Sequence, residues 1–182
     1  IEASGNVAIG SESLENSNVS NNTAVGYKAL KASTSGANNT AVGKDALLTN
    51  TSGGSNTAVG NDSLESNTSG GNNVGVGYRA LKSQTTASNN TALGYQAGTA
   101  ITTGDQSTCL GYDAGKSITT AARLTAIGHR AGEDVTGQNN TIVGANTGLG
   151  ITSGTGNTIM GVGAAETGNA SNVVAVGYGA LA

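Results

Sequence analysis

Hydrophobic and polar positions alternate in a short phrase that returns eleven times along the chain. Each copy ends in a glycine, and successive closing glycines lie 16 or 17 residues apart, from Gly10 and Gly26 to Gly161 and Gly177. The residue before the glycine is always aliphatic or methionine, and the residue three before it is threonine or valine, with a mostly small residue between them. This period-two alternation predicts short strands at 7–9, 23–25, 40–42, 57–59, 74–76, 91–93, 108–110, 125–127, 141–143, 158–160 and 174–176.

One face of each strand is expected to be buried, and the aliphatic residues indicate which. Because threonine and the following aliphatic residue share a face, that face is interpreted as interior. The predicted core therefore comprises the residues directly before the closing glycines, namely Val25, Val42, Val59, Val76, Leu93, Leu110, Ile127 and Val143.

A second apolar position follows each closing glycine. Early units place leucine four residues after it, as at Leu64, whereas later units have glycine there and an aliphatic residue seven after it, as at Ile118. Because a unit has either the leucine or the later aliphatic residue, both side chains are predicted to fill the same interior place. Asn67 occupies the phase of Ile118 within the Leu64 unit and is expected at the surface.

The regular period predicts a stacked architecture, since a unit of 17 residues cannot bury a core alone. Among 30 glycines there is no Asn-Gly or Asp-Gly pair, the strongest signal for a tight hairpin. Coils that always wind the same way are therefore favoured, each with two short strands and two bends. The prediction is an all-β parallel β-solenoid or β-roll of about eleven 17-residue coils, a single repeat array over residues 1–182 within a longer parent protein. Such a rod is about 50 Å long.

Asparagine recurs four residues before most closing glycines. In a stack of identical coils these side chains can hydrogen-bond along the rod as a ladder. The predicted structural ladder includes Asn22, Asn39, Asn56, Asn73 and Asn90.

The composition of the chain argues against two classes of partner, nucleic acids and the membrane interior. The net charge is −3 and charged residues make up 10% of the chain, which argues against nucleic acid because phosphate binding needs clustered basic residues. No apolar run reaches the ~20 residues of a membrane helix, so membrane insertion is not expected.

The core is thin, which favours self-association. Each coil offers roughly three inward apolar groups, and this burial must offset ~1–2 kcal/mol of backbone entropy per residue. Alanine rows precede and follow the closing glycines, and a flat alanine face permits close approach of a second chain. A homotrimeric fibre is therefore expected.

The repeats resemble those of a known class of surface proteins. Val7-Ala8-Ile9-Gly10 and the segment 22–30 (NTAVGYKAL) are similar to head repeats of trimeric autotransporter adhesins. They also resemble arrays in phage tail-fibre and related surface proteins that end in an intramolecular chaperone domain. The resemblance covers nearly the whole chain and implies a left-handed, homotrimeric β-roll displayed outside a cell or on a virion, with adhesion or receptor contact as its role. The adhesin repeats are typically shorter, and neither a coiled-coil stalk nor a chaperone domain is seen here.

Residues that could carry catalysis or bind a metal are isolated. His129 is the only histidine, Cys109 replaces an alanine of the repeat, and Glu133-Asp134 is the only adjacent acidic pair. Catalysis and metal binding need such groups to converge. We therefore predict no catalytic residue, metal site or cofactor, and a protein that is not an enzyme.

Tyr78, Tyr95 and Tyr112 stand directly after the closing glycine in three consecutive units. Stacking should set them in a line with neighbours ~4.8 Å apart. This stripe is either a contact surface for a cell-surface receptor or glycan, or a seal at the seam between chains.

The leading functional hypothesis is a structural and adhesive fibre segment, located extracellularly, at a cell surface or on a virion tail fibre. One alternative is the subunit of a filament that polymerises end to end. Another is an ice-binding β-solenoid, because a row of threonines on a flat sheet can match an ice lattice. The interior placement expected for Thr23 and Val25 argues against ice binding.

Overall fold

The chain forms a stack of eleven three-residue strands. The computed structural model describes residues 4–181 and contains no helix in that range. The strands are β1 (Val7–Ile9), β2 (Thr23–Val25), β3 (Thr40–Val42), β4 (Thr57–Val59), β5 (Val74–Val76), β6 (Thr91–Leu93), β7 (Thr108–Leu110), β8 (Thr125–Ile127), β9 (Thr141–Val143), β10 (Thr158–Met160) and β11 (Val174–Val176). All eleven predicted strand ranges are confirmed.

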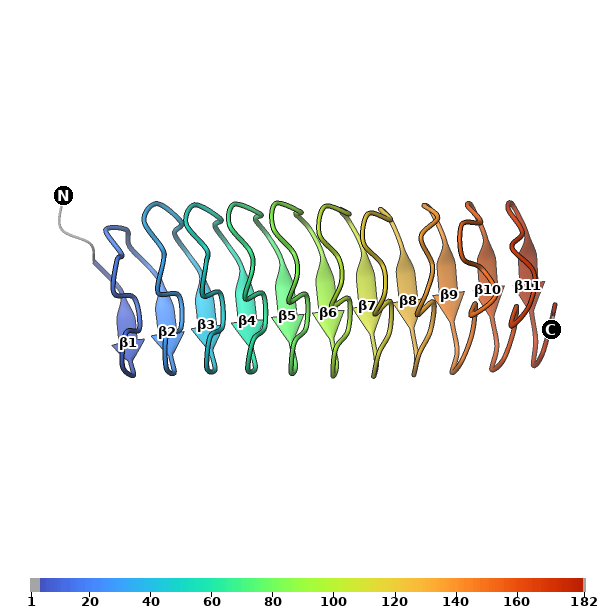
Figure 1. The fold of residues 1–182 in the computed structure, drawn as a ribbon, viewed down its shortest axis with the longest axis horizontal. Coiled ribbons are helices and arrows are strands. Elements are labelled where there is room, and N and C mark those ends of the chain that lie inside the picture. Colours follow the sequence, from blue (N-terminus) through green and yellow to red (C-terminus); the bar gives the residue numbers. More distant parts are fainter. Residues whose placement is uncertain (1–3, 182) are drawn as a thin grey trace.

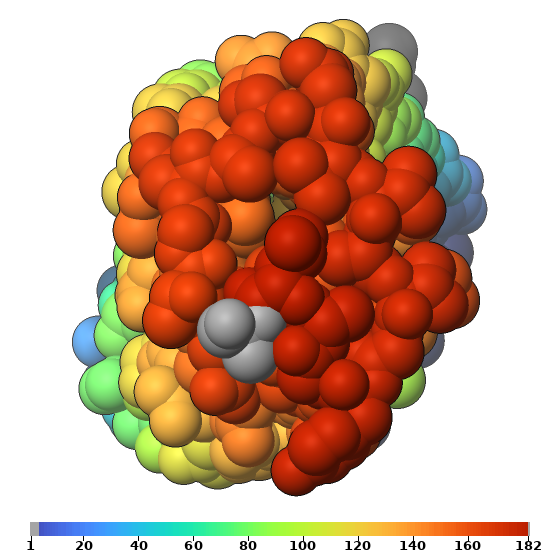
Figure 2. Space-filling model, turned by 90° about the vertical axis from the view of Figure 1, so that its right-hand side faces the viewer, coloured from blue at the N-terminus to red at the C-terminus, as the bar shows by residue number. Residues whose placement is uncertain are grey.

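The strands form one parallel sheet in which each pairs with the next along the chain. Pairing joins equivalent positions of successive units, as in Thr23 with Thr40 and Val25 with Val42. Figure 1 shows the strands side by side along the long axis, with the chain ends at opposite ends of the rod. Figure 2 looks at the end that carries the C-terminus, where the last coils cover most of those behind them. The parallel β-solenoid is confirmed, but the expected second strand of each coil is not found, because that part returns through turns and bends.

The closing glycines are required by the stacking of the coils. Gly60 has a φ of +134°, in a region that side chains rarely adopt. A Cβ at Gly60 would lie only 2.4 Å from the carbonyl oxygen of Gly77, the equivalent residue of the next coil. No side chain fits between backbones that approach this closely, which explains the closing glycine in every unit that is followed by another coil.

The predicted core residues on the strands do not face the interior. The middle residue of each strand from β2 to β11 is buried, and it is alanine in most coils, as at Ala24 and Ala58. The residues predicted as core are half-buried or exposed instead, namely Val25, Val42, Val59, Val76, Leu93, Leu110, Ile127 and Val143. The alternation was right but its phase was wrong.

The narrow interior explains this correction. The middle of each strand packs against the returning segment, which brings a buried alanine three residues after the glycine, as at Ala80. At Gly75, the middle residue of β5, a Cβ would already lie 2.7 Å from the Ser63 hydroxyl oxygen. Only small side chains fit in most coils. The two alanine rows are therefore inside the coil, where they cannot form the expected contact face for a second chain.

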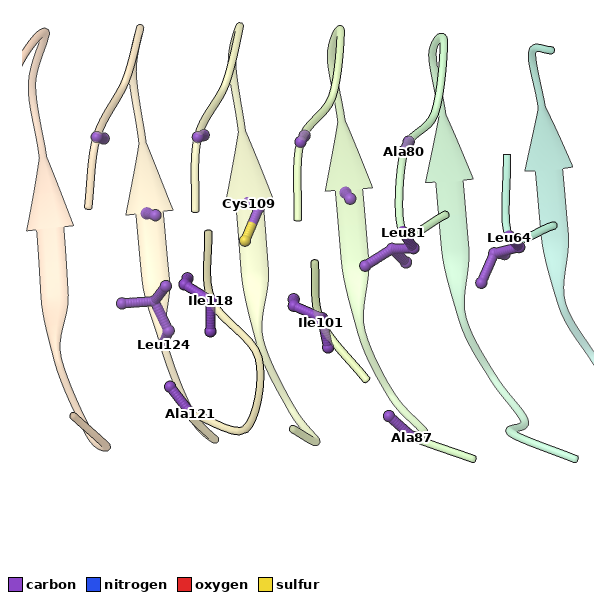
Figure 3. Close-up of a cluster of buried hydrophobic side chains, with 14 of the residues drawn as sticks. Leu64, Ala80, Leu81, Ala87, Ile101, Cys109, Ile118, Ala121 and Leu124 are labelled. Carbon is purple, nitrogen blue, oxygen red and sulfur yellow. The ribbon is translucent and has the colours of Figure 1, made fainter. Parts of the chain in front are cut away.

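The larger aliphatic side chains fill the rest of the core, and their predicted exchange is confirmed. Leu64 and Ile118 are both fully buried. In a coil of the second type, a Cβ at Gly98 would lie 3.0 Å from Cδ1 of Ile101. Ile101 thus occupies space that a leucine at position 98 would need. Figure 3 shows Leu64 and Leu81, and then Ile101 and Ile118, between the strands and the returning segments.

The asparagine ladder is present and buried. The backbone N–H of Asn39 donates to Oδ1 of Asn22 at 2.8 Å, and this bond repeats through Asn56, Asn73 and Asn90 at 2.9 Å. The side-chain amides donate mainly to a loop carbonyl, as from Asn39 to Gly53 at 2.9 Å. The ladder therefore ties each coil to the next through side chain and backbone together.

A second buried polar ladder was missed. Asn67, expected at the surface, is fully buried, and its amide donates to Oδ1 of Asn50 at 2.8 Å and to the carbonyl of Gly70 at 3.0 Å. Gln84 is also fully buried at the same phase and donates to Ala87 at 2.9 Å. In coils with leucine after the glycine, this inward position carries a hydrogen-bonding side chain because the leucine already fills the apolar space.

Candidate interaction surface

The outward side of the sheet carries two parallel rows of side chains. The outer threonine row consists of Thr23, Thr40, Thr57, Thr91, Thr108, Thr125, Thr141 and Thr158. The outer aliphatic row consists of Ile9, Val25, Val42, Val59, Val76, Leu93, Leu110, Ile127, Val143, Met160 and Val176. Together with Val7, Val74 and Val174, these residues form the outer sheet face.

The outer sheet face is apolar for a solvent-facing surface. None of its positions carries a charge. Leu93 is 51% exposed and Met160 41% exposed. Eleven strands of three residues span about 500 Å² of sheet, and the outer aliphatic row forms a continuous apolar strip along it. A contiguous row of exposed apolar side chains is typical of an interaction site.

The outer threonine hydroxyls differ from other threonine hydroxyls of the rod. At the turns of several coils, threonine hydroxyls bond to the next coil: Thr51 Oγ1 donates to the carbonyl of Thr68 at 3.0 Å, and Thr68 Oγ1 to that of Thr85 at 3.0 Å. Within residues 4–181, no such protein partner is found for the Oγ1 atoms of the outer threonine row. These hydroxyl groups are available to an external partner.

Most charged side chains lie together on another side, here called the charged edge. They occupy positions shortly after the closing glycines and include Glu12, Lys31, Asp62, Glu65, Arg79, Lys82, Asp113, Lys116, Arg130 and Glu133. Opposite charges often face each other in successive coils, as where Lys82 pairs with Glu65 at 2.9 Å and Asp62 at 3.1 Å. Burial alone would raise the pKa of Asp62, but Lys82 and Arg79 outweigh it and hold the pKa below its usual value. Some of these charges thus pair between coils, and all of them lie away from the outer sheet face.

The three tyrosines form a ladder directly beside the outer sheet face. Ring centroids are 5.1 Å apart between Tyr78 and Tyr95 and between Tyr95 and Tyr112. His129 extends the stack at 5.3 Å from Tyr112. The predicted line is confirmed, although its role as a receptor contact stays a prediction. Because both faces of the Tyr95 ring are covered by neighbours, a partner can reach only ring edges and hydroxyl groups.

The isolated reactive residues are held apart. Cys109 is buried in the middle of β7, and burial raises its thiol pKa to about 12, so the unreactive thiol form prevails. Glu133 pairs with Arg130 at 2.5 Å, while Asp134 lies exposed beside it. Within the described range, no three histidine, cysteine or acidic side chains gather as metal ligands would.

A hollow opens near the C-terminal end of the charged edge. It is lined by Asn146, Val162, Gly163, Glu166, Tyr178 and Gly179. Glu166 is its single charged group, so the hollow lacks the paired groups that acid–base chemistry needs.

Comparisons with protein-family models, with curated proteins and with solved structures gave no match to this chain. Over residues 4–181 there is also no helix long and apolar enough to cross a membrane.

Proposed function

We propose that this chain is a rigid, non-catalytic rod within an extracellular or virion-borne attachment fibre, and that copies of it associate through the outer sheet face. The observation that carries the proposal is the combination of a rigid stack with one uncharged face. The sheet is continuous from β1 to β11, and the aliphatic side chains on its outer side remain in contact with solvent.

Self-association accounts for the separation of charge on the rod. Burying the outer aliphatic row stabilises the assembly by about 25 cal/mol for each Å² of apolar surface removed from water. The charged edge lies elsewhere and stays hydrated, so no charge needs to be desolvated. Three copies with their sheets turned inward form the homotrimer that the repeat resemblance implies.

In this assembly, the surfaces that stay exposed to solvent would make the contacts for attachment. In such an assembly the charged edge stays in water and the hydroxyl groups of the tyrosine ladder can point outward. These groups suit polar contact with a receptor or glycan. The tyrosine ladder adjoins the sheet face, so a role at the seam between chains is the competing outcome for it.

A charge placed on the outer sheet face should separate the copies. Leu93→Lys puts a lysine into the proposed interface in every copy, and an unpaired buried charge costs about 3–5 kcal/mol. We expect the molar mass in sedimentation equilibrium to fall to that of one chain while the β-sheet signal in circular dichroism persists.

The matched control for that prediction is Leu48→Lys. Leu48 lies five residues after its closing glycine, at the position where Lys31 and Lys82 stand in other coils. This change should leave the assembly intact. Equal behaviour of the two variants would contradict an interface on the outer sheet face.

Ice binding is a second candidate, because its main objection is removed. Thr23 and Val25, expected inside, lie on the outer sheet face. The outer threonine row offers unpartnered hydroxyl groups at the regular strand spacing of about 4.8 Å, each beside a methyl group. A rigid, periodic array of this kind can hydrogen-bond to an ordered layer of water.

Ice binding predicts thermal hysteresis, a gap between freezing and melting points in the presence of the protein. Thr108→Tyr should abolish it, because the bulky ring interrupts the flat face. Thr103→Tyr is the control, since Thr103 is an exposed residue outside the strands. No hysteresis in the unmodified protein would exclude this second candidate and leave self-association as the use of the face.

A further inference from the structure

Backbone hydrogen bonds of the residues before and after each ring hold Tyr78, Tyr95 and Tyr112 in a stack. The N–H of Gly94 donates to Val76 and that of Gln96 to Tyr78, at 2.8 and 2.9 Å, so the residues around Tyr95 are fixed to those around Tyr78. The same pair of bonds, at 2.8 and 2.9 Å, fixes Tyr112 to Tyr95. The rings are thereby kept in register from coil to coil.

The ring planes are close to parallel. The interplanar angle is 22° between Tyr78 and Tyr95 and 6° between Tyr95 and Tyr112. Rings in this arrangement place equivalent carbons beside one another, including the carbons next to each hydroxyl. Tyr95 is 43% and Tyr112 49% exposed, so an oxidant can reach the ring edges and the rings have room to tilt.

We propose that the tyrosine ladder is an oxidative cross-linking site, at which a haem peroxidase with hydrogen peroxide joins tyrosines of consecutive coils as dityrosine. Each of two phenols loses one electron and one proton to give a phenoxyl radical. The radicals couple through one new C–C bond between carbons adjacent to the hydroxyls, and two ring hydrogens then move to the oxygens. Overall, two tyrosines and one hydrogen peroxide give one dityrosine and two water molecules.

The geometry makes this coupling selective for three of the five tyrosines. Tyr27 is followed at the same position of the next coil by Lys44, and Tyr178 is preceded there by Val162. The Tyr27 ring lies under the Lys28 ammonium at 4.8 Å instead of beside another phenol. A radical on Tyr27 or Tyr178 therefore has no stacked tyrosine in its own chain.

A dityrosine link would act as a covalent staple along the rod. It closes a loop of 17 residues between consecutive coils, which restricts the unfolded chain as a disulfide does. The single buried cysteine cannot provide such a link within the chain. Cross-linking therefore offers this protein a means of hardening under oxidising conditions.

The test is treatment of the purified full chain with a haem peroxidase and hydrogen peroxide at several protein concentrations. We expect dityrosine fluorescence, the loss of two hydrogen masses per link in intact-mass analysis, and a higher melting temperature. Peptide mapping should find Tyr78 joined to Tyr95, or Tyr95 to Tyr112, within one chain at every dilution.

The central residue of the ladder gives the decisive variant. Tyr95→Phe keeps an aromatic ring and the fold but leaves Tyr78 and Tyr112 two coils apart, so the intrachain link should be lost. Tyr27→Phe is the matched control and should leave the yield unchanged. The proposal is overturned if links map equally to Tyr27 and Tyr178, if Tyr95→Phe cross-links like the unmodified chain, or if only covalent dimers form.

Discussion

Gly60→Ala is expected to cost more than about 4 kcal/mol of unfolding free energy, a loss reserved for changes that the structure cannot absorb. The added Cβ would lie 2.4 Å from the carbonyl oxygen and 2.7 Å from the carbonyl carbon of Gly77. Both atoms belong to the backbone of the next coil, so neither can move without breaking the backbone hydrogen bonds between the coils. The φ of +134° adds conformational strain. Urea unfolding followed by circular dichroism measures the loss.

Gly54→Ala is the matched control for this effect. Gly54 lies eleven residues after its closing glycine, where the preceding coil has Ala37. A Cβ there meets the Ala37 carbonyl oxygen at 3.2 Å, and φ is not positive. The cost should stay within about 1 kcal/mol. A Gly60→Ala protein as stable as the Gly54→Ala protein would show that the coils are not packed backbone to backbone.

The second large effect concerns the exchange of aliphatic side chains in the core. Gly98→Leu should overpack the coil, because a Cβ there already lies 3.0 Å from both Ile101 and Leu81. Ile101→Gln should lose about 1–3 kcal/mol, because it buries an amide in the space that an apolar side chain fills. The double variant converts this coil to the type of its neighbour, which has Leu81 and Gln84 at these positions. We expect the two changes to compensate, with a coupling energy of about 1–3 kcal/mol.

A double-mutant cycle from urea unfolding measures that coupling. Ile151→Gln combined with Gly98→Leu serves as the control, because those buried positions lie three coils apart. Additive losses in the Gly98–Ile101 pair would mean that leucine and isoleucine fill separate spaces.

The architecture could be predicted because repetition averages out local ambiguity. A single Thr23-Ala24-Val25 segment says little, but eleven segments at one spacing leave few architectures other than a stack of coils. The return of each coil through turns instead of a second strand could not be predicted, because it depends on residues such as Leu64 that adopt a positive φ. Turn geometry of this kind has no clear signature for a residue other than glycine or asparagine.

The phase of the strand could not be read from hydrophobicity alone. Val25 is more apolar than Ala24, yet Ala24 is inside, because the interior is too narrow for a larger side chain in most coils. The useful signal was the recurrence of small residues in the middle position. Ile142 and Ile159 are larger exceptions. Ile142 uses space left by Gly148, because a Cβ at Gly148 would lie only 2.9 Å from Cδ1 of Ile142.

The candidate surface was hidden by the same error of phase. If the outer aliphatic row is core, the threonines that share its face are interior as well, so the sequence alone argues against a surface there. The tyrosine ladder was predictable because its position outside the strand does not depend on which face is buried. Its stacking distance follows from strand spacing alone.

Small-angle X-ray scattering of the unmodified protein tests most directly whether copies associate through the outer sheet face. Side-by-side association predicts three times the 17.6 kDa mass of one chain. The longest dimension should remain that of a single rod, about 50 Å, while the cross-section grows. A mass of one chain at every concentration, or a length that increases with mass at constant cross-section, would contradict association through this face.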